Sequence, residues 1–360
     1  MVAKLKDVAK LAGVSVTTVS RVINNYGSLS EKTINKVHEA MRELNYQPNA
    51  LARAMQGKPS KFIGLIFPNI INPFYAELVN DLEYRLFAKG YKTIIASSAQ
   101  NPDIEHDYLA MLMANQVDGI ISGSHNLGIE EYQRIKAPIV SFDRYLADNI
   151  PIVSADSYRG GKMAAEYLIA KNVSHPAILI DEDTSVSPTL NRVQGAIDCF
   201  SAHQIEYVPL DAKKTNLETT FPGEYDGVMA TNDVDALKIM RLAVRAGKRI
   251  NEDFHVTGYD GSKMICELTP ELPTVQQPTA ELADLLIDTL MERIKNPDAK
   301  LTPAPLAVAF TIQKTNKRKS RRNCSILTFY GRSMKNLIIY TQIKNAPAKT
   351  RFLFASAWPA

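Results

Sequence analysis

The chain has little cysteine, a single tryptophan and no long apolar run. Its three cysteines, Cys199, Cys266 and Cys324, are odd in number and widely separated, which predicts free thiols in a reducing compartment rather than a disulfide framework. No stretch approaches the roughly 18 apolar residues that a membrane-spanning helix needs. The first ten residues also lack the apolar core of a secretion signal. We therefore expect a cytoplasmic protein that does not associate with membranes.

Signatures of catalysis and metal binding are missing as well. The six histidines do not cluster in the sequence, and no cysteines and histidines have the spacing of zinc ligands. The chain has no G-x-G-x-x-G, no G-x-x-x-x-G-K-[ST] and no G-x-S-x-G motif. We expect no catalytic residue, metal or cofactor, and we expect that the protein is not an enzyme.

Charge is distributed unevenly along the 360 residues. Residues 1–60 hold nine Lys or Arg and four Asp or Glu, a net charge of +5. Residues 317–360 hold ten basic residues and no acidic one. The segment between them, 61–316, has 34 acidic and 23 basic residues. A basic head on an acidic body is typical of a DNA-binding module joined to a domain that does not bind DNA.

The basic head contains the pattern of a helix-turn-helix. Asp7–Ala12 predicts one helix, Gly13 a tight turn, and Ser15 the N-cap of a second helix that runs to Ile23. A third helix is predicted over 30–44. The residues spaced to form an apolar seam between the first two helices are Val8, Leu11, Val19 and Val22. An ordinary helical hairpin is the alternative interpretation.

The start of the second helix carries side chains suited to reading DNA. We expect base contacts from Val16, Thr17 and Arg21, because a guanidinium fork pairs with guanine and methyl groups suit thymine. Val16 has the alternative of packing in the interior. The residues expected to contact DNA phosphates are Ser15, Thr18, Asn24 and Ser30.

Residues 61–316 alternate short buried-strand patterns with amphipathic helix patterns, which predicts parallel sheets with helices on both faces. The predicted strands are 62–68, 93–96, 119–122, 139–143, 152–156, 177–180, 227–230, 255–258 and 306–312. The segment is too long for one such sheet of ordinary size, so we expect two doubly wound lobes. Ligands bind such sheets beyond the carboxyl ends of the strands.

Aromatic and polar residues lie at or after several of these strand ends. Aromatic faces suit a sugar ring, while carboxylate, amide and guanidinium groups bind hydroxyls. The residues expected to bind a ligand are Phe74, Tyr75, Asp143, Arg192, Asn232 and Asp260. Phe74 and Tyr75 fit equally well as core residues of their helix, and Asp143 and Asp233, which lie at or after strand ends, fit helix caps.

The head resembles the LacI/GalR family of bacterial repressors. The segments that carry the resemblance are Asp7-Val8-Ala9, Ala12-Gly13-Val14-Ser15, Thr18-Val19-Ser20-Arg21-Val22 and Pro48-Asn49 with Ala52-Arg53. The resemblance implies a helix-turn-helix domain at 1–47, a hinge helix and linker at 48–60, and an effector-binding and dimerisation domain at 61–316. It also implies that Arg21 is the last of the base-reading residues.

The hinge helix of this family enters the minor groove only when it is paired with its twin. The matching positions here are Asn49, Ala52 and Met55, where Met55 stands in place of the usual leucine wedge. An isolated helix this short is marginal in water. The resemblance therefore implies a homodimer whose hinges fold on double-stranded operator DNA.

The resemblance continues to about Asn316 and implies a type I periplasmic-binding-protein fold. One lobe is expected at 62–155 and 278–304, and the other at 156–277 and 305–316. Arg192, Asn232 and Asp260 match the family's effector positions most directly. The segments 114–121 and 124–132 resemble regulators of sucrose operons in Gram-positive bacteria. The expected function is therefore repression of a sugar-utilisation operon, relieved by a sugar or a sugar phosphate.

Three points stay open on the sequence alone. A corepressor-dependent regulator of another carbon or nucleotide pathway is one alternative, and a sugar-binding module without DNA control is another. The 44 residues of the basic tail, 317–360, contain no heptad repeat. We expect this tail to be mostly disordered and without an evolved function, although basic runs also bind phosphates.

Overall fold

The structure is a computed structural model of the chain, and it consists of two compact units, residues 1–61 and 62–360. It describes residues 3–24, 26–47, 59–124, 126, 130–180, 188, 190–211, 225–313, 326–330 and 338–342. The expected hinge residues Asn49, Ala52 and Met55 lie outside these ranges, as does Cys324. Within the described ranges, no helix combines the length and apolar character that crossing a membrane needs.

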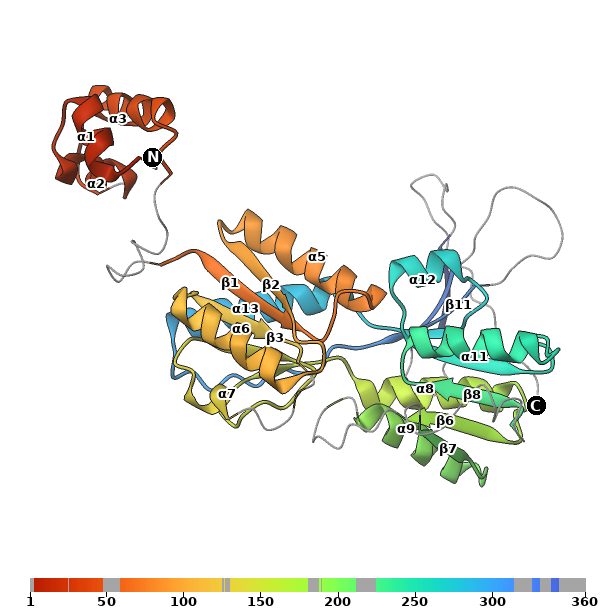
Figure 1. Ribbon diagram of the computed structural model, residues 1–360. Helices are drawn as coiled ribbons and strands as arrows, with labels where there is room; N and C mark the ends of the chain where they lie inside the picture. The colour runs from red at the N-terminus through yellow and green to blue at the C-terminus, as the bar shows by residue number, and fades with distance from the viewer. Residues whose placement is uncertain are drawn as a thin grey trace, which may run out of the picture. The chain divides into compact units, whose positions relative to one another are not determined.

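The head unit is all-α, as expected, and its helices are α1 (Leu5–Ala12), α2 (Val16–Ile23) and α3 (Glu31–Glu43) (Figure 1). Its buried core is Val8, Ala9, Ala12, Val19, Val22, Val37 and Ala40. The predicted seam was wrong at Leu11, whose side chain is 45% exposed. The face of α1 that packs inward instead carries Ala9 and Ala12, whose small side chains allow a close approach of the helices.

Local capping fixes the turn between α1 and α2. Gly13 ends α1 in the left-handed region at φ +65°, which a residue with a Cβ adopts only with strain. Ser15 then begins α2, because its Oγ accepts a hydrogen bond from the Thr18 amide at 3.1 Å. Ser30 caps α3 in the same way through the Thr33 amide. The turn therefore sets the direction of the second helix.

The first lobe contains a five-stranded, wholly parallel sheet in the order β2-β1-β3-β4-β5. Its strands are β1 (Phe62–Phe67), β2 (Lys92–Ser97), β3 (Gly119–Ser122), β4 (Ile139–Phe142) and β5 (Ile152–Val153). Alternate residues of β1 face opposite layers: Leu65 and Phe67 pack with α5 (Pro73–Ala88) and α13 (Thr279–Lys295). Ile66 packs with α6 (Pro102–Ala114) on the other face.

The segment after β3 is held by a buried carboxylate on α6. Ser124, Asn126 and Tyr132 each donate a hydrogen bond to Glu105, which is fully buried. The helix expected between β3 and β4 is short, since α7 covers only Glu131–Arg134.

The second lobe contains an eight-stranded sheet in the order β13-β12-β11-β10-β9-β8-β6-β7. The strands β6 to β10 pair in parallel, and β11 to β13 pair antiparallel. The strands of the parallel part are β6 (Pro176–Ile180), β7 (Val208–Asp211), β8 (Gly227–Ala230), β9 (His255–Asp260) and β10 (Thr274–Gln276). The expectation of parallel sheets therefore holds for the first lobe and for the main part of the second.

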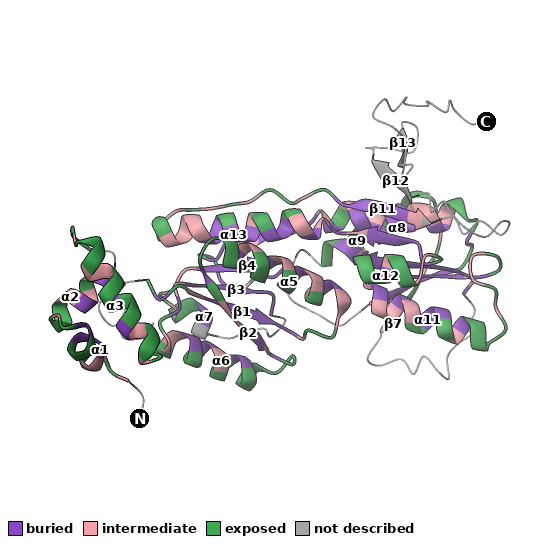
Figure 2. Ribbon diagram, turned by 90° about the horizontal axis from the view of Figure 1, so that it is seen from above, coloured by how far each residue is buried: buried purple, intermediate pink, exposed green. Residues whose placement is uncertain are grey.

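Helices cover both faces of the second sheet. One face packs against α8 (Ser157–Ala170) and α9 (Leu190–Ala202), in a core that includes the free thiol of Cys199. The other face packs against α11 (Asp233–Arg245), and α12 (Lys263–Leu268) lies on the same side. Figure 2 shows that the central strands of both sheets are buried, whereas the outer faces of the helices are exposed.

The chain crosses between the lobes three times. The first crossing follows β5 at Ala155, the second follows β10 at Gln277, and the third lies near Leu306. The first and third crossings bond to each other, because the Asp156 amide donates to the Leu306 carbonyl at 2.7 Å and the Leu306 amide donates to the Ser154 carbonyl at 2.9 Å. The crossings form a narrow connection about which the lobes can move.

Two strands lie in the basic tail, where we expected mostly disorder. After β11 (Ala309–Gln313), the strand β12 (Ile326–Tyr330) pairs antiparallel with β11, and β13 (Ile338–Gln342) pairs with β12. The segment 326–330 consists of Ile, Leu, Thr, Phe and Tyr, and β-branched and aromatic residues of this kind favour a strand. These two strands account for 10 of the 44 residues of the tail, so the expectation that the tail is mostly disordered stays a prediction.

Candidate functional site

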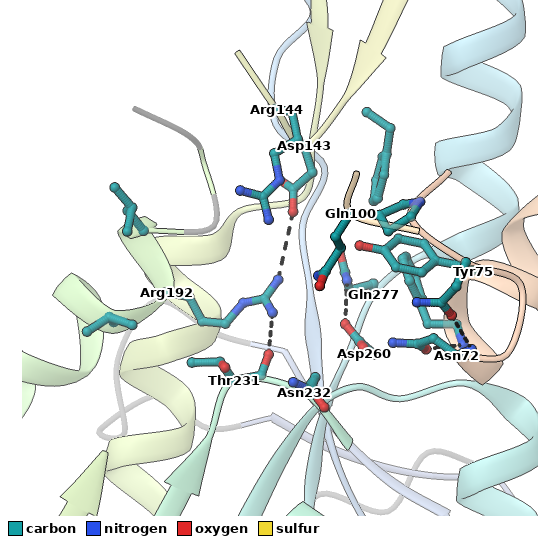
Figure 3. Close-up of a pocket in the computed structure, with 16 residues that line it drawn as sticks. Asn72, Tyr75, Gln100, Asp143, Arg144, Arg192, Thr231, Asn232, Asp260 and Gln277 are labelled. Carbon is teal, nitrogen blue, oxygen red and sulfur yellow. Dashed lines mark hydrogen bonds and ion pairs between the residues drawn. The ribbon is translucent and has the colours of Figure 1, made fainter. Parts of the chain in front are cut away.

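A cavity of about 190 Å³ lies between the two lobes of the larger unit (Figure 3). Its wall includes all six residues expected to bind a ligand: Phe74, Tyr75, Asp143, Arg192, Asn232 and Asp260. Three come from the first lobe and three from the second, so a bound molecule would contact both lobes at once. The role of these residues in binding is taken up below as a proposal.

The start of α5 supplies the aromatic part of the wall. Asn72 caps this helix, since its Oδ1 accepts a hydrogen bond from the Phe74 amide at 2.9 Å. Asn69 in turn accepts from the amides of Ile71 and Asn72 at 3.1 and 2.9 Å. The cap aims Tyr75 at the cavity, while Phe74 is buried and contributes both to the core and to the wall. Phe74 is thus a core residue of its helix and also lines the cavity.

Two charged residues follow β4. Asp143 has a left-handed backbone at φ 56°, and both it and Arg144 are buried at the cavity. Asp143 ends a strand rather than capping a helix, contrary to the alternative considered from the sequence. Burial raises the pKa of Asp143 to about 6, although the Arg192 and Arg144 guanidinium groups act in the opposite direction.

Arg192 is held on three sides. Its Nη2 lies 3.8 Å from Asp143 Oδ2 across the cleft, and its Nη1 donates to the Thr231 carbonyl. Its guanidinium carbon lies 3.4 Å from the centre of the Tyr259 ring, a cation–π arrangement. Burial lowers the pKa of Arg192, but Tyr259, Asp260 and Asp143 together raise it above its ordinary value. Arg192 is therefore a fixed positive charge that links the lobes.

Close packing of α8 on α9 sets the position of Arg192. A Cβ on Gly161 would overlap the Arg192 carbonyl oxygen, and one on Gly195 would overlap the Tyr158 carbonyl oxygen. A Cβ on Gly160 would meet the phenol of Tyr259. Three glycines thus let the two helices and the ring under the guanidinium approach closely.

Asp260 is the last residue of β9, and it is hydrogen-bonded to Gln277 in the second of the three crossings between the lobes. Gln277 Nε2 donates to Asp260 Oδ1 at 2.9 Å, and both side chains are buried (Figure 3). Burial raises the pKa of Asp260 to about 8, with Arg192 lowering it and Asp233 raising it. Asn232 caps α11 by accepting from the Asp235 amide at 2.8 Å, so Asn232 rather than Asp233 is the cap.

Asp233 has a structural position behind the site. It accepts hydrogen bonds from Thr274 Oγ1 at 2.5 Å and from the Gly261 amide at 2.8 Å. It does not line the cavity. Burial raises its pKa to about 7, while these hydrogen bonds act in the opposite direction.

Several wall residues were not among the predicted site residues. These are Pro68, Asn69, Asn72, Gln100, Phe142, Arg144, Leu190, Val193, Thr231 and Gln277. Gln277 had no local signal, because it does not follow a predicted strand. Asn72, Gln100 and Arg144 each follow a predicted strand within a few residues, so the rule that selected the six residues covers them as well. Gln277 could have been predicted only on the assumption that a segment connecting the lobes lines the ligand site.

The head presents the residues expected to read bases on its surface. Val16 is 45% exposed, which is contrary to the interior alternative, and Thr17 and Arg21 are also exposed. All three lie on α2 with their side chains outside the core. Of the expected phosphate contacts, Ser15 and Ser30 are exposed N-caps, and Thr18 and Asn24 are half-buried. Asn24 Nδ2 donates to the Ser20 carbonyl at 2.7 Å, which fixes the end of the helix.

Two stretches of the chain match known families. Residues 4–49 match the family described as bacterial regulatory proteins, lacI family, and residues 60–309 match the periplasmic binding proteins and sugar binding domain of the LacI family. The chain belongs to the LacI family. As a LacI-family member, it joins a helix-turn-helix head to a two-lobed periplasmic-binding-protein fold, and the predicted fold class and regulator class are confirmed.

Sucrose operon repressors are among the most similar LacI-family relatives. The sucrose operon repressor of Streptococcus mutans is 49% identical over 303 residues, which cover 83% of this chain and 95% of the relative. That of Pediococcus pentosaceus is 47% identical over 322 residues, which cover 86% of this chain and 99% of the relative. The resemblance to sucrose regulators of Gram-positive bacteria is thereby confirmed.

A solved LacI-family structure carries a sugar in the same fold. It is described as a periplasmic binding protein/LacI transcriptional regulator from Alkaliphilus metalliredigens complexed with D-xylulofuranose. It is 29% identical to this chain, with a TM-score of 0.64, and the match covers 69% of this chain and 97% of that one. Both of the described relatives above are named as repressors rather than as enzymes.

Proposed function

We propose that this protein is a homodimeric repressor of a sucrose-utilisation operon, and that a sugar bound between the lobes releases it from operator DNA. The observation that carries the proposal is the cavity, whose wall takes side chains from both lobes in a chain that also has a helix-turn-helix head. The two sucrose operon repressors support the choice of operon.

DNA recognition is assigned to α2. A recognition helix in the major groove reads bases with its N-terminal side chains, and Val16 and Thr17 lie there with methyl groups suited to thymine. Arg21 provides a bidentate partner for guanine. One head reads one half-site, so a symmetric dimer reads a pseudo-palindromic operator. The hinge residues Asn49, Ala52 and Met55 are proposed to add minor-groove contacts.

Sugar binding is assigned to the cavity between the lobes. Tyr75 and Phe142 offer ring faces, and Asp143, Asn232 and Asp260 offer oxygen and nitrogen atoms for hydroxyl groups. The furanose bound by the Alkaliphilus metalliredigens protein is a ketose ring of the type that the fructose half of sucrose contains. A ketofuranose is therefore the class of ring we propose for this site.

Release of DNA follows from ligand contacts that span the lobes. The ligand stabilises whichever lobe arrangement brings both walls to it, and it shifts the population only as far as it prefers that arrangement. The lobes connect through three crossings, one of which carries Gln277 in the cavity wall. We propose that movement about these crossings separates the paired hinges.

The protein is proposed to act in the cytoplasm, where the operator is, and without catalysing a reaction on its sugar. An enzyme would need a nucleophile or an acid–base pair aimed at a bound substrate. The buried carboxylates here are engaged with Arg192 and Gln277, which suits holding a ligand rather than transferring a proton.

An electrophoretic mobility shift with a symmetric operator tests the proposal. The full chain should retard an inverted-repeat duplex in preference to a scrambled duplex at moderate ionic strength. Adding sucrose or fructose should restore the mobility of the free operator. Stronger retardation with sugar would show a corepressor mechanism instead, and equal retardation of both duplexes would remove the repressor role.

A further inference from the structure

We infer that the cavity selects an uncharged sugar and discriminates against its phosphorylated forms. This inference rests on the proposed sugar-responsive function and states which chemical class of sugar the same site takes. It follows from four features of the described wall: balanced charges, an arginine nitrogen that is already bonded, two helix ends that are capped, and unpaired atoms suited to a hydroxyl group.

The charges of the wall nearly cancel. Two guanidinium groups, Arg144 and Arg192, face two buried carboxyl groups, Asp143 and Asp260. A phosphate monoester carries about −1.5 to −2 at neutral pH and would lie among these carboxylates. Even with Asp260 protonated, the four groups carry one positive charge, which does not balance a phosphate.

One nitrogen of the Arg192 guanidinium, Nη1, is already in use. Arginine binds phosphate through two parallel N–H groups. Here Nη1 donates to the Thr231 carbonyl, and the ring of Tyr259 covers one face of the guanidinium. A phosphate that binds through Nη1 would have to break the hydrogen bond to Thr231.

Two helix N-termini at the cavity, those of α5 and α11, are capped by side chains. Phosphates bind helix N-termini through free backbone amides. At the start of α5, Asn72 Oδ1 accepts from the Phe74 amide at 2.9 Å, and the first helical residue is Pro73, which has no amide hydrogen. At the start of α11, Asn232 Oδ1 accepts from the Asp235 amide at 2.8 Å. These two helix ends therefore offer fewer amides to an anion.

The wall retains one donor and one acceptor that suit a neutral hydroxyl. Arg192 Nε and Gln277 Oε1 are buried and have no hydrogen-bond partner within the described part of the chain. A hydroxyl group both donates and accepts, so it can satisfy a donor and an acceptor of this kind. A phosphate oxygen only accepts, so a phosphate group placed against Gln277 Oε1 would leave that acceptor unsatisfied, at a cost in affinity.

Isothermal titration calorimetry on the full-length protein tests the inference. The ligands are fructose and sucrose, and each is paired with its 6-phosphate. At least one uncharged sugar should bind at least about tenfold more tightly than its phosphate, since the phosphate would lie among carboxylates of like charge. Equal or tighter binding of the phosphate overturns the inference. Binding of none of the four sugars overturns the proposed sugar function itself, which is a different result.

Two substitutions test whether the carboxylates cause the discrimination. Asp143→Asn and Asp260→Asn each remove one negative charge from the wall. In a variant that keeps a cooperative thermal transition, the ratio of phosphate to sugar dissociation constants should fall at least about threefold. Asp107→Asn makes the same chemical change on the exposed side of α6 and should leave the ratio unchanged. An unchanged ratio in both folded cavity variants overturns the inference.

Discussion

At the scale of single residues, Arg192 shows how a buried charge is stabilised by neighbouring protein groups. A guanidinium in a low-dielectric site is costly unless it is paired and hydrogen-bonded. Arg192 has a carboxylate, a carbonyl oxygen and an aromatic ring around it. Asp143 belongs to the first lobe and Arg192 to the second, so this ion pair spans the lobes. Loss of one of the two residues would leave the other as a buried charge without its partner.

The proposed role of Asp143 predicts a pH dependence of sugar binding. Its pKa is about 6, and the groups that face it are Arg144, Arg192, Asp260 and Tyr75. A carboxylate accepts hydroxyl hydrogen bonds better than a neutral acid does, so affinity should rise as the pH increases from about 5 to 7. Calorimetry across this range should show the rise. Asp143→Asn should flatten it, and Asp107→Asn should not.

The same shift predicts the opposite trend for stability. The folded protein binds the Asp143 proton more tightly than the unfolded chain, whose pKa is near 3.8. This contribution to stability is therefore fully present below that value and is lost as the pH rises through about 6.

A profile of sugar affinity that is flat from pH 5 to 7 in the unmodified protein would contradict the proposed role of Asp143 in binding sugar.

Arg21 is the residue on which base discrimination should depend most. Arg21→Ala should cost about 1–3 kcal/mol of discrimination at one base pair of each half-site, because a bidentate guanine contact is lost. The matched control is Arg42→Ala, an exposed arginine on α3. Fluorescence anisotropy against a set of single-base operator variants measures both. Uniform weakening on every sequence would show that Arg21 contacts phosphate instead.

At the scale of elements, the packing of α8 on α9 supports the site. Gly161→Ala should lower the free energy of unfolding by about 1–3 kcal/mol, since the new methyl group would overlap the Arg192 carbonyl oxygen and force the helices apart. Urea unfolding measures the loss. The variant should also bind sugar more weakly, because α9 carries Arg192. Unchanged stability together with unchanged sugar affinity would show that the contact between these helices is dispensable.

A second element-scale contact ties the lobes together. Glu77 on α5 accepts from the Lys263 amide of α12 at 2.8 Å, and Lys263 Nζ lies 3.3 Å from its carboxylate. Glu77→Gln should weaken sugar binding by up to about fivefold, because the Lys263 side chain is exposed and an ion pair at the surface is worth up to about 1 kcal/mol. The effect should shrink in high salt. Glu83→Gln, an exposed acid on the same helix, is the control. Equal effects of the two substitutions would contradict a tie between the lobes.

Elements with a strong local pattern were predictable from the sequence. The buried strands β1, β3, β4, β6 and β8 were all expected, because continuous apolar runs bounded by polar residues have few other interpretations. Ser15 and Ser30 marked helix starts, because a serine side chain can accept a hydrogen bond from a free amide of the first turn. The six predicted cavity residues follow the rule that ligands lie beyond strand ends.

Features set by tertiary contact were not predictable in this way. Leu11 was assigned to the core, but the inward face of α1 uses alanines. Gln277 reaches the cavity only because a crossing between lobes passes there. The strands β12 and β13 depend on the free edge of β11, which no local pattern reveals.

At the scale of the whole molecule, binding of the operator and binding of the sugar are proposed to be coupled equilibria. The proposed dimer binds a symmetric operator through two heads, and the proposed sugar binds between two lobes. If sugar weakens operator binding, operator must weaken sugar binding by the same factor, because the coupling free energy is shared. Couplings of this kind are typically about 1–3 kcal/mol, or 5–150-fold.

The most direct test measures sugar affinity in the presence and absence of DNA. Calorimetry would titrate the same uncharged sugar into the free protein and into the protein saturated with an inverted-repeat duplex. The account predicts that the sugar binds at least about fivefold more weakly to the DNA complex. A scrambled duplex should leave the affinity unchanged. Equal sugar affinity with and without bound operator would contradict the central claim that the cleft controls the hold on DNA.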